Sequence, residues 1–295
     1  MFGEALALGA ALTWSLSVIL FRRSEAISPL GMNLFKNAIG IVLLAVTLVG
    51  AGQSMDFQRP AEDWLRLVAS GVLGIGFADT LIFMALRRLG PGLLAIVDTV
   101  YAPVIVVLSV LFLDEHIDGS FLVGAAAVVL GVLLASTGGP RVPVGEAPPG
   151  RRMGIFLGVV GIAAMGVGVI LAKPVLARGS LPEVTLIRLV AGALSQLVWI
   201  GLVPKQRTAL LAFKPGPAWR TLVPAGVLGA YVSLLLWLGG FKWADASVAA
   251  VLNQMSTVFT IVLARVVLGE VLGRRKAAGA AIAVFGAVVI MVFRA

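Results

Sequence analysis

The chain has 295 residues, of which 60% are hydrophobic and 13% are charged, and its mean hydropathy is +1.05. Soluble domains carry about 25% charged residues, so this composition excludes an ordinary soluble fold and predicts an integral membrane protein. The absence of cysteine excludes disulfides and thiolate metal sites. The net charge is +9, and most of the basic residues lie between the apolar segments. They form no basic patch interleaved with aromatic residues, which argues against nucleic-acid binding.

The apolar segments have the length of membrane-spanning helices, which need about 20 residues each. In chain order they are residues 3–21, 29–50, 64–85, 91–113, 121–137, 153–172, 182–203, 220–239, 244–268 and 275–293. They are too long for the strands of a membrane barrel and lack the alternation of such strands. The first segment has no basic start and no cleavage motif, so we interpret it as a retained helix. The sequence therefore predicts an all-α integral membrane protein with ten transmembrane helices.

A linker rich in glycine and proline, residues 138–152, divides the chain. It predicts a first five-helix repeat at residues 1–137 and a second at residues 153–295. Because five is an odd number, the second half enters the bilayer upside down relative to the first. The expected fold is two inverted five-helix repeats, an architecture that many secondary transporters use for alternating access.

Internal matches between the halves support this division. A shift of 155 residues, without a gap, places Gly71–Gly74 on Gly226–Gly229 and Gly124–Ala126 on Gly279–Ala281. A slightly smaller shift places Lys36 on Arg188. The loops after the odd-numbered segments carry more Arg and Lys than the other loops. The positive-inside rule places those loops in the cytoplasm and both termini outside.

Four ionisable residues stand out inside the predicted spans: Lys36 in the second, Asp79 in the third, Asp98 in the fourth and Arg188 in the seventh. Charges at this depth are costly and face a cavity or a partner. Two interpretations stay open. The charges form a midplane site for a charged or zwitterionic solute, or Lys36 pairs with Asp79 or Asp98 and only locks helices together. We assign Lys36 and Arg188 a structural or coupling role.

Proton coupling is a further hypothesis for the same residues. Asp79 and Asp98 are the acidic residues well inside the predicted spans, and a proton-coupled carrier needs a group that gains and loses a proton during its cycle. A free carboxylate favours coupling, whereas a carboxylate paired with Lys36 favours a structural role.

Polar and aromatic residues at mid-span depth are the candidates for binding a substrate. Aromatic rings there can stack on a solute or pack between helices, and amide side chains can bind a solute or bond neighbouring helices. The predicted substrate-binding residues are Trp14, Asp79, Phe83, Asp98, Tyr101, Trp237, Asn253 and Gln254.

Catalytic chemistry finds little support in the sequence. The single histidine, His116, lies in a turn between apolar segments, and there is no P-loop and no zinc-protease motif. We therefore expect no enzyme activity, no metal and no cofactor.

Several local motifs resemble those of the drug/metabolite transporter superfamily, in its ten-helix EamA-type branch. The resemblance covers nearly the whole chain. It rests on Leu12–Ser15, the basic residues Lys36 and Arg188, Met84–Arg88, and the element Leu113–Glu115 before Gly124 and Gly131, repeated as Leu268–Glu270 before Gly279 and Gly286.

The resemblance implies a multi-pass protein of the bacterial inner (plasma) membrane that exports or exchanges amino acids, metabolites or drugs. The aromatic-amino-acid exporters are one similar subgroup. The family pattern implies cytoplasmic termini, against the charge count, so the orientation stays open. The prediction is a secondary transporter of small organic solutes that works in the lipid bilayer by alternating access. The alternatives are a channel-like facilitator and an intramembrane enzyme.

Overall fold

The computed structural model describes residues 1–21, 27–136, 150–268 and 273–293. Ten helical stretches of these residues are long and apolar enough to cross a membrane. They are Phe2–Phe21, Pro29–Gly50, Ala61–Leu89, Ile96–Leu113, Gly119–Ser136, Arg151–Arg178, Leu181–Leu202, Trp219–Trp243, Ala246–Leu263 and Arg274–Phe293, here numbered spans 1 to 10. The ten predicted spans are therefore all present, and the described residues contain no strand. Most of the predicted linker, and Glu270, lie outside the described residues.

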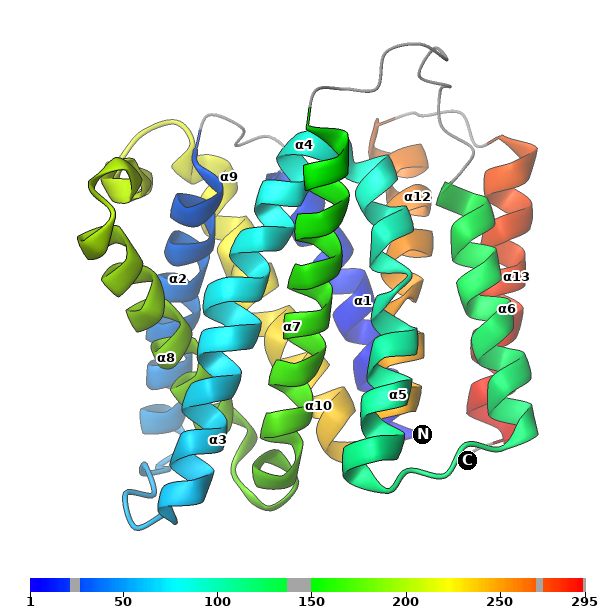
Figure 1. The fold of residues 1–295 in the computed structure, drawn as a ribbon, viewed down its shortest axis with the longest axis horizontal. Helices are drawn as coiled ribbons and strands as arrows, with labels where there is room; N and C mark the ends of the chain where they lie inside the picture. The colour runs from blue at the N-terminus through cyan, green and yellow to red at the C-terminus, as the bar shows by residue number, and fades with distance from the viewer. Residues whose placement is uncertain (22–26, 137–149, 269–272, 294–295) are drawn as a thin grey trace.

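The described residues of the first half form seven helical elements, most of which are labelled in Figure 1. They are α1 (Phe2–Phe21), α2 (Pro29–Gly50), α3 (Ala61–Gly71), the π-helix η2 (Val72–Ala78), α4 (Asp79–Asp98), α5 (Tyr101–Leu113) and α6 (Gly119–Ser136). The start of α2 shows how the sequence sets a boundary. The Ser28 hydroxyl accepts a hydrogen bond from the Gly31 amide at 3.2 Å, and Pro29 occupies the first turn, where no amide donor is needed.

The second half repeats this pattern with two differences: it has an extra 3₁₀ segment, and the helix equivalent to α4 is divided in two at residues 244–245. Its elements are α7 (Arg151–Arg178), α8 (Leu181–Leu202), the 3₁₀ helix η3 (Pro204–Phe213), α9 (Trp219–Gly226), the π-helix η4 (Val227–Val232), α10 (Ser233–Trp243), α11 (Ala246–Asn253), α12 (Met255–Leu268) and α13 (Arg274–Phe293). The π-helices η2 and η4 begin at positions 155 residues apart, Val72 and Val227.

Two predicted boundaries were wrong. The sixth segment was expected to end at residue 172, before Pro174, but α7 continues through this proline to Arg178. The extra turn is stabilised from outside, because the Lys242 ammonium donates to the carbonyl oxygens of Leu176 at 2.7 Å and Gly179 at 2.6 Å. The third and fourth segments were expected to be separate helices, but helix α4 continues from one into the other and ends at Asp98.

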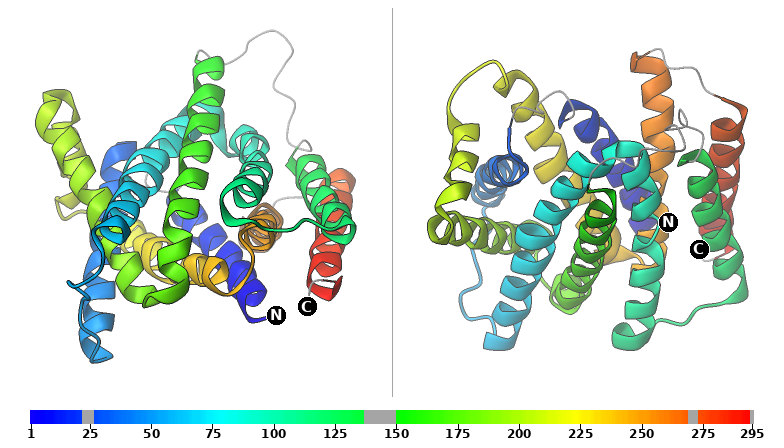
Figure 2. Two further views of the ribbon diagram at one scale, coloured as in Figure 1. Left: turned by 60° about the horizontal axis from the view of Figure 1, so that its bottom comes forward. Right: turned by 45° about the horizontal axis from the view of Figure 1, so that its top comes forward.

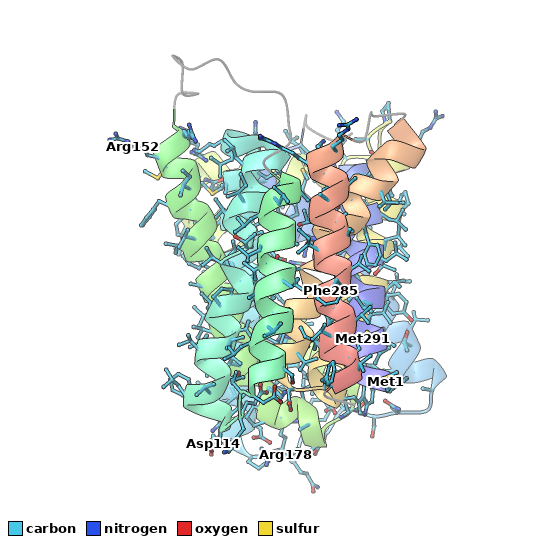
Figure 3. The ribbon with its side chains drawn as sticks, turned by 90° about the vertical axis from the view of Figure 1, so that its right-hand side faces the viewer. Met1, Asp114, Arg152, Arg178, Phe285 and Met291 are labelled. Carbon is cyan, nitrogen blue, oxygen red and sulfur yellow. The ribbon has the colours of Figure 1, made fainter. Side chains whose placement is uncertain are left out.

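The two halves run in opposite directions through the bundle. Met1 lies at the same end as Arg178, whereas Arg152, at the start of α7, lies at the opposite end (Figure 3). Span 1 and span 6 therefore cross the bundle in opposite directions, which is the inverted repeat that an odd number of spans requires.

The spans of the two halves interleave. Helix α1 packs along α9, η4, α10 and α12, and the equivalent helix α7 packs along η2, α4 and α5. Helices α2 and α8 pack against each other, as do α6 and α13, which stand side by side at one edge of the bundle (Figures 1 and 2). Each half therefore completes its packing with helices of the other half.

The α6–α13 pair is a direct backbone contact between glycines, in which the equivalent positions pair crosswise: Gly131 faces Gly279, and Gly124 faces Gly286. A Cβ atom at Gly279 would lie 2.5 Å from the carbonyl oxygen of Gly131, and one at Gly286 would lie 2.5 Å from that of Gly124. Only glycine fits at such distances, which is how small residues hold helices together in lipid, where hydrophobic burial gives no net attraction.

The two ends of the bundle differ in charge. Among the described residues, the end that contains Arg152 carries no acidic side chain. Its basic residues are Arg87, Arg88, Arg151, Arg152, Lys205, Arg207, Lys214, Arg220, Arg274, Arg275 and Lys276. We call it the basic end. At the other end, Arg59, Arg66, Lys173 and Arg178 each form a salt bridge with an acid.

Candidate functional site

A cavity of about 140 Å³ lies inside the bundle, and every residue that lines it belongs to a span. We call it the central cavity. Spans 1, 2, 3, 4, 6, 7, 8 and 9 contribute to its wall, whereas spans 5 and 10 do not. The predicted substrate-binding residues that line it are Trp14, Asp79, Asp98, Tyr101, Trp237, Asn253 and Gln254. Lys36 and Arg188 line it as well.

Phe83 is the predicted substrate-binding residue that the structure places elsewhere. Its side chain is 6% exposed and packs edge-to-face on Phe21, with ring centroids 5.8 Å apart. Met32 and Phe35 belong to the same apolar cluster, at the basic end of α1 and α2. Phe83 lies one helical turn beyond Asp79, so depth in the span did not decide which space its ring would occupy.

Lys36 and Asp79 form an ion pair in the wall of the cavity. The Lys36 Nζ atom lies 2.7 Å from Asp79 Oδ2, and the two side chains are 5% and 14% exposed. The Lys36 ammonium also donates to the Asn37 side-chain oxygen at 3.1 Å. Of the two partners that the sequence offered to Lys36, the structure selects Asp79.

The π-helix η2 positions this pair and exposes backbone carbonyls that need partners, because its i→i+5 bonding disturbs the regular ladder. Asn33 donates to the Ile75 carbonyl oxygen at 2.9 Å. The Gly76 carbonyl oxygen accepts from the Thr80 hydroxyl at 2.7 Å and from the Gln196 amide at 3.5 Å. Polar side chains of spans 2, 3 and 7 thus satisfy the carbonyls, as a hydrocarbon environment demands.

Sequence reasoning missed Asn33, Asn37 and Gln196, although a signal for two of them was present. Asn33 and Asn37 flank Lys36 at helical spacing and so lie on one face of α2. Asn37 donates to Asn33 at 3.2 Å and to Gln196 at 3.3 Å, which connects the two halves of the protein. A polar stripe along an otherwise apolar span predicts such a network.

The cavity is built from equivalent positions of the two halves. A Cβ atom at Gly71 would collide with the backbone of Arg188, and one at the equivalent Gly226 would lie 3.5 Å from the Cα atom of Lys36. Equivalent residues therefore occupy equivalent places. The equivalent pairs in the wall are Trp14 and Met165, Lys36 and Arg188, Gly74 and Gly229, Asp79 and Leu234, Asp98 and Asn253, and Tyr101 and Ser256.

Helices are interrupted at the same place in both halves. Helix α4 ends at Asp98 and α5 begins at Tyr101, while α11 ends at Asn253 and α12 begins at Met255. The Gln254 side chain bridges the two interruptions, because its amide donates to the Asp98 carbonyl oxygen at 2.9 Å. Irregular backbone at this depth is tolerated where it lines a cavity or is buried in protein.

Arg188 is the most deeply buried charge in the wall, at 1% exposure. Its guanidinium lies over the Trp237 ring, 5.7 Å from the ring centroid. The Nε and Nη1 atoms are buried without a hydrogen-bond partner, and no salt bridge to Arg188 occurs among the described residues.

Glu115, outside the spans, holds the start of α11. Its carboxylate accepts from the amides of Ala246 at 2.6 Å and Ser247 at 3.0 Å, and it pairs with Lys173 at 3.1 Å. Burial by itself raises the pKa of Glu115, but Lys173 and the two amides outweigh it and hold the pKa below its usual value. Within the described residues, no group of three His, Asp or Glu side chains could hold a metal ion.

Comparisons with known proteins agree on the architecture. The sequence model of the EamA-like transporter family matches residues 1–137 and 152–292. No curated protein shows a significant match to the sequence. A crystal structure of another protein is 21% identical and superposes with a TM-score of 0.79, covering 97% of this chain and 95% of that one. At this identity the likeness shows the fold.

Proposed function

The chain belongs to the EamA-like transporter family, whose members are membrane transporters of small solutes, and we propose that it is a secondary transporter of small organic solutes such as amino acids or related metabolites. Export or exchange is the direction that we propose. The observation that carries the proposal is the central cavity, which lies within the spans and is lined by equivalent positions of two inverted halves.

This arrangement suits alternating access. Because the wall is shared between halves that run in opposite directions, a rocking motion of one half against the other opens the cavity to one side and then to the other. The paired π-helices and the helix interruptions lie at the cavity. Their backbone hydrogen bonding is already irregular, so a bending motion there breaks fewer regular helical bonds than it would elsewhere in a span.

The test is a counterflow screen with purified protein in proteoliposomes, using labelled amino acids, nucleobases and cationic drugs. We expect saturable exchange of at least one solute class. Flux that does not saturate would instead identify a channel-like facilitator, and chemical conversion of a solute would identify an intramembrane enzyme. Absence of exchange for every class would contradict the proposal.

The two tyrosines provide a matched control for the cavity. Tyr101 lines it, whereas the Tyr231 hydroxyl bonds Thr47 at 2.7 Å and the side chain lies outside the lining. With a substrate in hand, Tyr101→Ala should raise KM about three- to tenfold, the value of a lost aromatic contact. Tyr231→Ala should leave KM unchanged. Equal KM effects of the two variants would show that the central cavity is not the substrate site.

For proton coupling we propose Asp98 as the candidate, because Asp79 is already paired with Lys36. No hydrogen bond to the Asp98 carboxylate occurs within the described part of the chain. We expect an imposed pH gradient to change wild-type flux and Asp98→Asn to abolish that response. Wild-type flux that ignores the gradient would refute coupling, and a response that survives in Asp98→Asn would place the proton site elsewhere.

A further inference from the structure

The two halves treat their equivalent buried cations differently. In the first half, Lys36 on span 2 is neutralised by Asp79 on span 3 at 2.7 Å. The equivalent positions in the second half are Arg188 on span 7 and Leu234 on span 8, and both line the central cavity. A leucine thus stands in the second half at the position of the acid in the first, and Arg188 lacks the partner that Lys36 has.

The substitute for that acid is a tryptophan ring. Arg188 lies over Trp237, and a ring face attracts a guanidinium but cannot accept hydrogen bonds from its five in-plane N–H groups. The Nε and Nη1 atoms therefore stay buried without a partner. Such donors on a buried charged group need a partner, which in a cavity is a bound solute or an ordered water that the solute displaces.

We propose that Arg188 binds the carboxylate of the transported solute, a small monocarboxylate with an apolar or aromatic body. The proposal rests on the proposed transport function. A guanidinium presents its donors in a fork that matches a carboxylate. Trp14, Met165 and Leu234 line the same cavity and offer apolar surface to the body of such a solute. Because Lys36 and Asp79 neutralise each other, Arg188 is the wall cation left to receive an anionic group.

The experiment compares ligands that share a body and differ in their charged group. The probes are 3-phenylpropionate, L-phenylalanine and phenethylamine, together with 4-methylpentanoate and isopentylamine as an aliphatic pair. Affinities are measured by isothermal titration calorimetry with the purified full chain in detergent, and competition for counterflow is measured in proteoliposomes. We expect at least one carboxylate probe to bind roughly tenfold or more tightly than the amine with the same body, as a charge-assisted hydrogen bond requires.

Two variants remove the free guanidinium by different routes. Arg188→Gln deletes the charge, and Leu234→Asp supplies the acid that the first half has at this position. Both should weaken carboxylate binding roughly 10- to 100-fold and leave amine binding unchanged or tighter. Leu234→Asp retains the arginine and gives it a partner, so it should also raise the melting temperature of the ligand-free protein. Arg188→Lys keeps the charge without the fork and should bind carboxylates with intermediate affinity.

Arg66→Gln is the matched control, because it removes one positive charge from an exposed salt bridge outside the cavity. The proposal is overturned if amines bind as tightly as carboxylates, if no carboxylate probe binds the wild type, or if Arg188→Gln and Leu234→Asp keep carboxylate affinity within twofold. Saturable exchange of another solute in any of these cases would leave the transport function standing. Absence of exchange for every solute class would overturn both.

Discussion

Replacement of Lys36 by methionine tests the buried ion pair of the first half. The variant leaves the Asp79 carboxylate, 14% exposed, without its cation at 2.7 Å. Breaking a buried pair by removing one partner costs about 3–5 kcal/mol, and the lower limit applies here because Asp79 faces the cavity. At about 2–4 °C per kcal/mol, Lys36→Met should lower the melting temperature by roughly 6–12 °C.

The reciprocal change and the double variant complete a cycle. Asp79→Asn should cost less, about 2 kcal/mol, because Lys36 keeps its bond to Asn37 and gains an amide oxygen as acceptor. The double variant Lys36→Met/Asp79→Asn leaves no buried charge at this place and should be about as stable as the better single variant. The expected coupling free energy is then about 3 kcal/mol, equal to the full cost of Lys36→Met. Thermal unfolding of the purified protein in one detergent, followed by tryptophan fluorescence, measures all four species.

The pair Arg66–Glu62 provides the control cycle. Its atoms lie 2.6 Å apart, but its side chains are 37% and 69% exposed, so solvent screens the attraction. Its coupling should be about 0.3–0.5 kcal/mol. If Lys36 and Asp79 couple no more strongly than this exposed pair, their effects are additive and the buried ion pair does not stabilise the fold as reasoned.

Three further predictions concern other parts of the molecule. Gly131→Ala should destabilise the protein by about 1–3 kcal/mol in thermal unfolding, because the added Cβ would lie 2.6 Å from a carbonyl oxygen of α13, whereas Gly50→Ala, with nothing within 4 Å, should not. Glu115→Gln should lower the melting temperature at neutral pH. The folded pKa of Glu115 lies below its usual value of 4.5, so the carboxylate stabilises the fold when it is ionised. The difference in melting temperature between wild type and variant should therefore be constant above pH 4.5 and shrink as the pH falls below it. A pH-independent difference would contradict it. The positive-inside rule places the basic end in the cytoplasm and the termini, at the opposite end, outside. Alkaline phosphatase fused to the C-terminus should therefore be active, and a green fluorescent protein fusion should be dark. The reverse result would place both termini in the cytoplasm.

The ten spans and the internal repeat could be predicted because length and apolarity alone specify them. The 155-residue shift even aligns Asp79 with Leu234, so the loss of the acid beside Arg188 was readable from the sequence. The partner of Lys36 was not, because two acids lie at similar depth and depth does not specify the direction in which a side chain points. Phe83 shows the same limit. Its depth matches the cavity, but its ring packs on Phe21.

Backbone irregularities lay beyond sequence reasoning for a different reason. A glycine-rich run such as Gly71–Gly76 is compatible with α-helix and π-helix alike, and tertiary partners decide between them. Those partners, Asn33 and Gln196, come from spans 2 and 7. The continuation of α7 through Pro174 likewise depends on Lys242, a residue of span 8.

The paired π-helices are a backbone feature that the two halves share. A π-turn holds one residue more than an α-turn, so each is equivalent to a single-residue insertion. An insertion in one half alone would change the spacing between equivalent residues by one at that point, yet the spacing is 155 at Gly71 and again at Gly131, on either side of η2 and η4. The two halves therefore do not differ by an insertion across this region, and the irregular turn stands at the same position in both. The halves thus share this irregular turn of the backbone, and they differ at the residue beside the buried cation, which is Asp79 in the first half and Leu234 in the second.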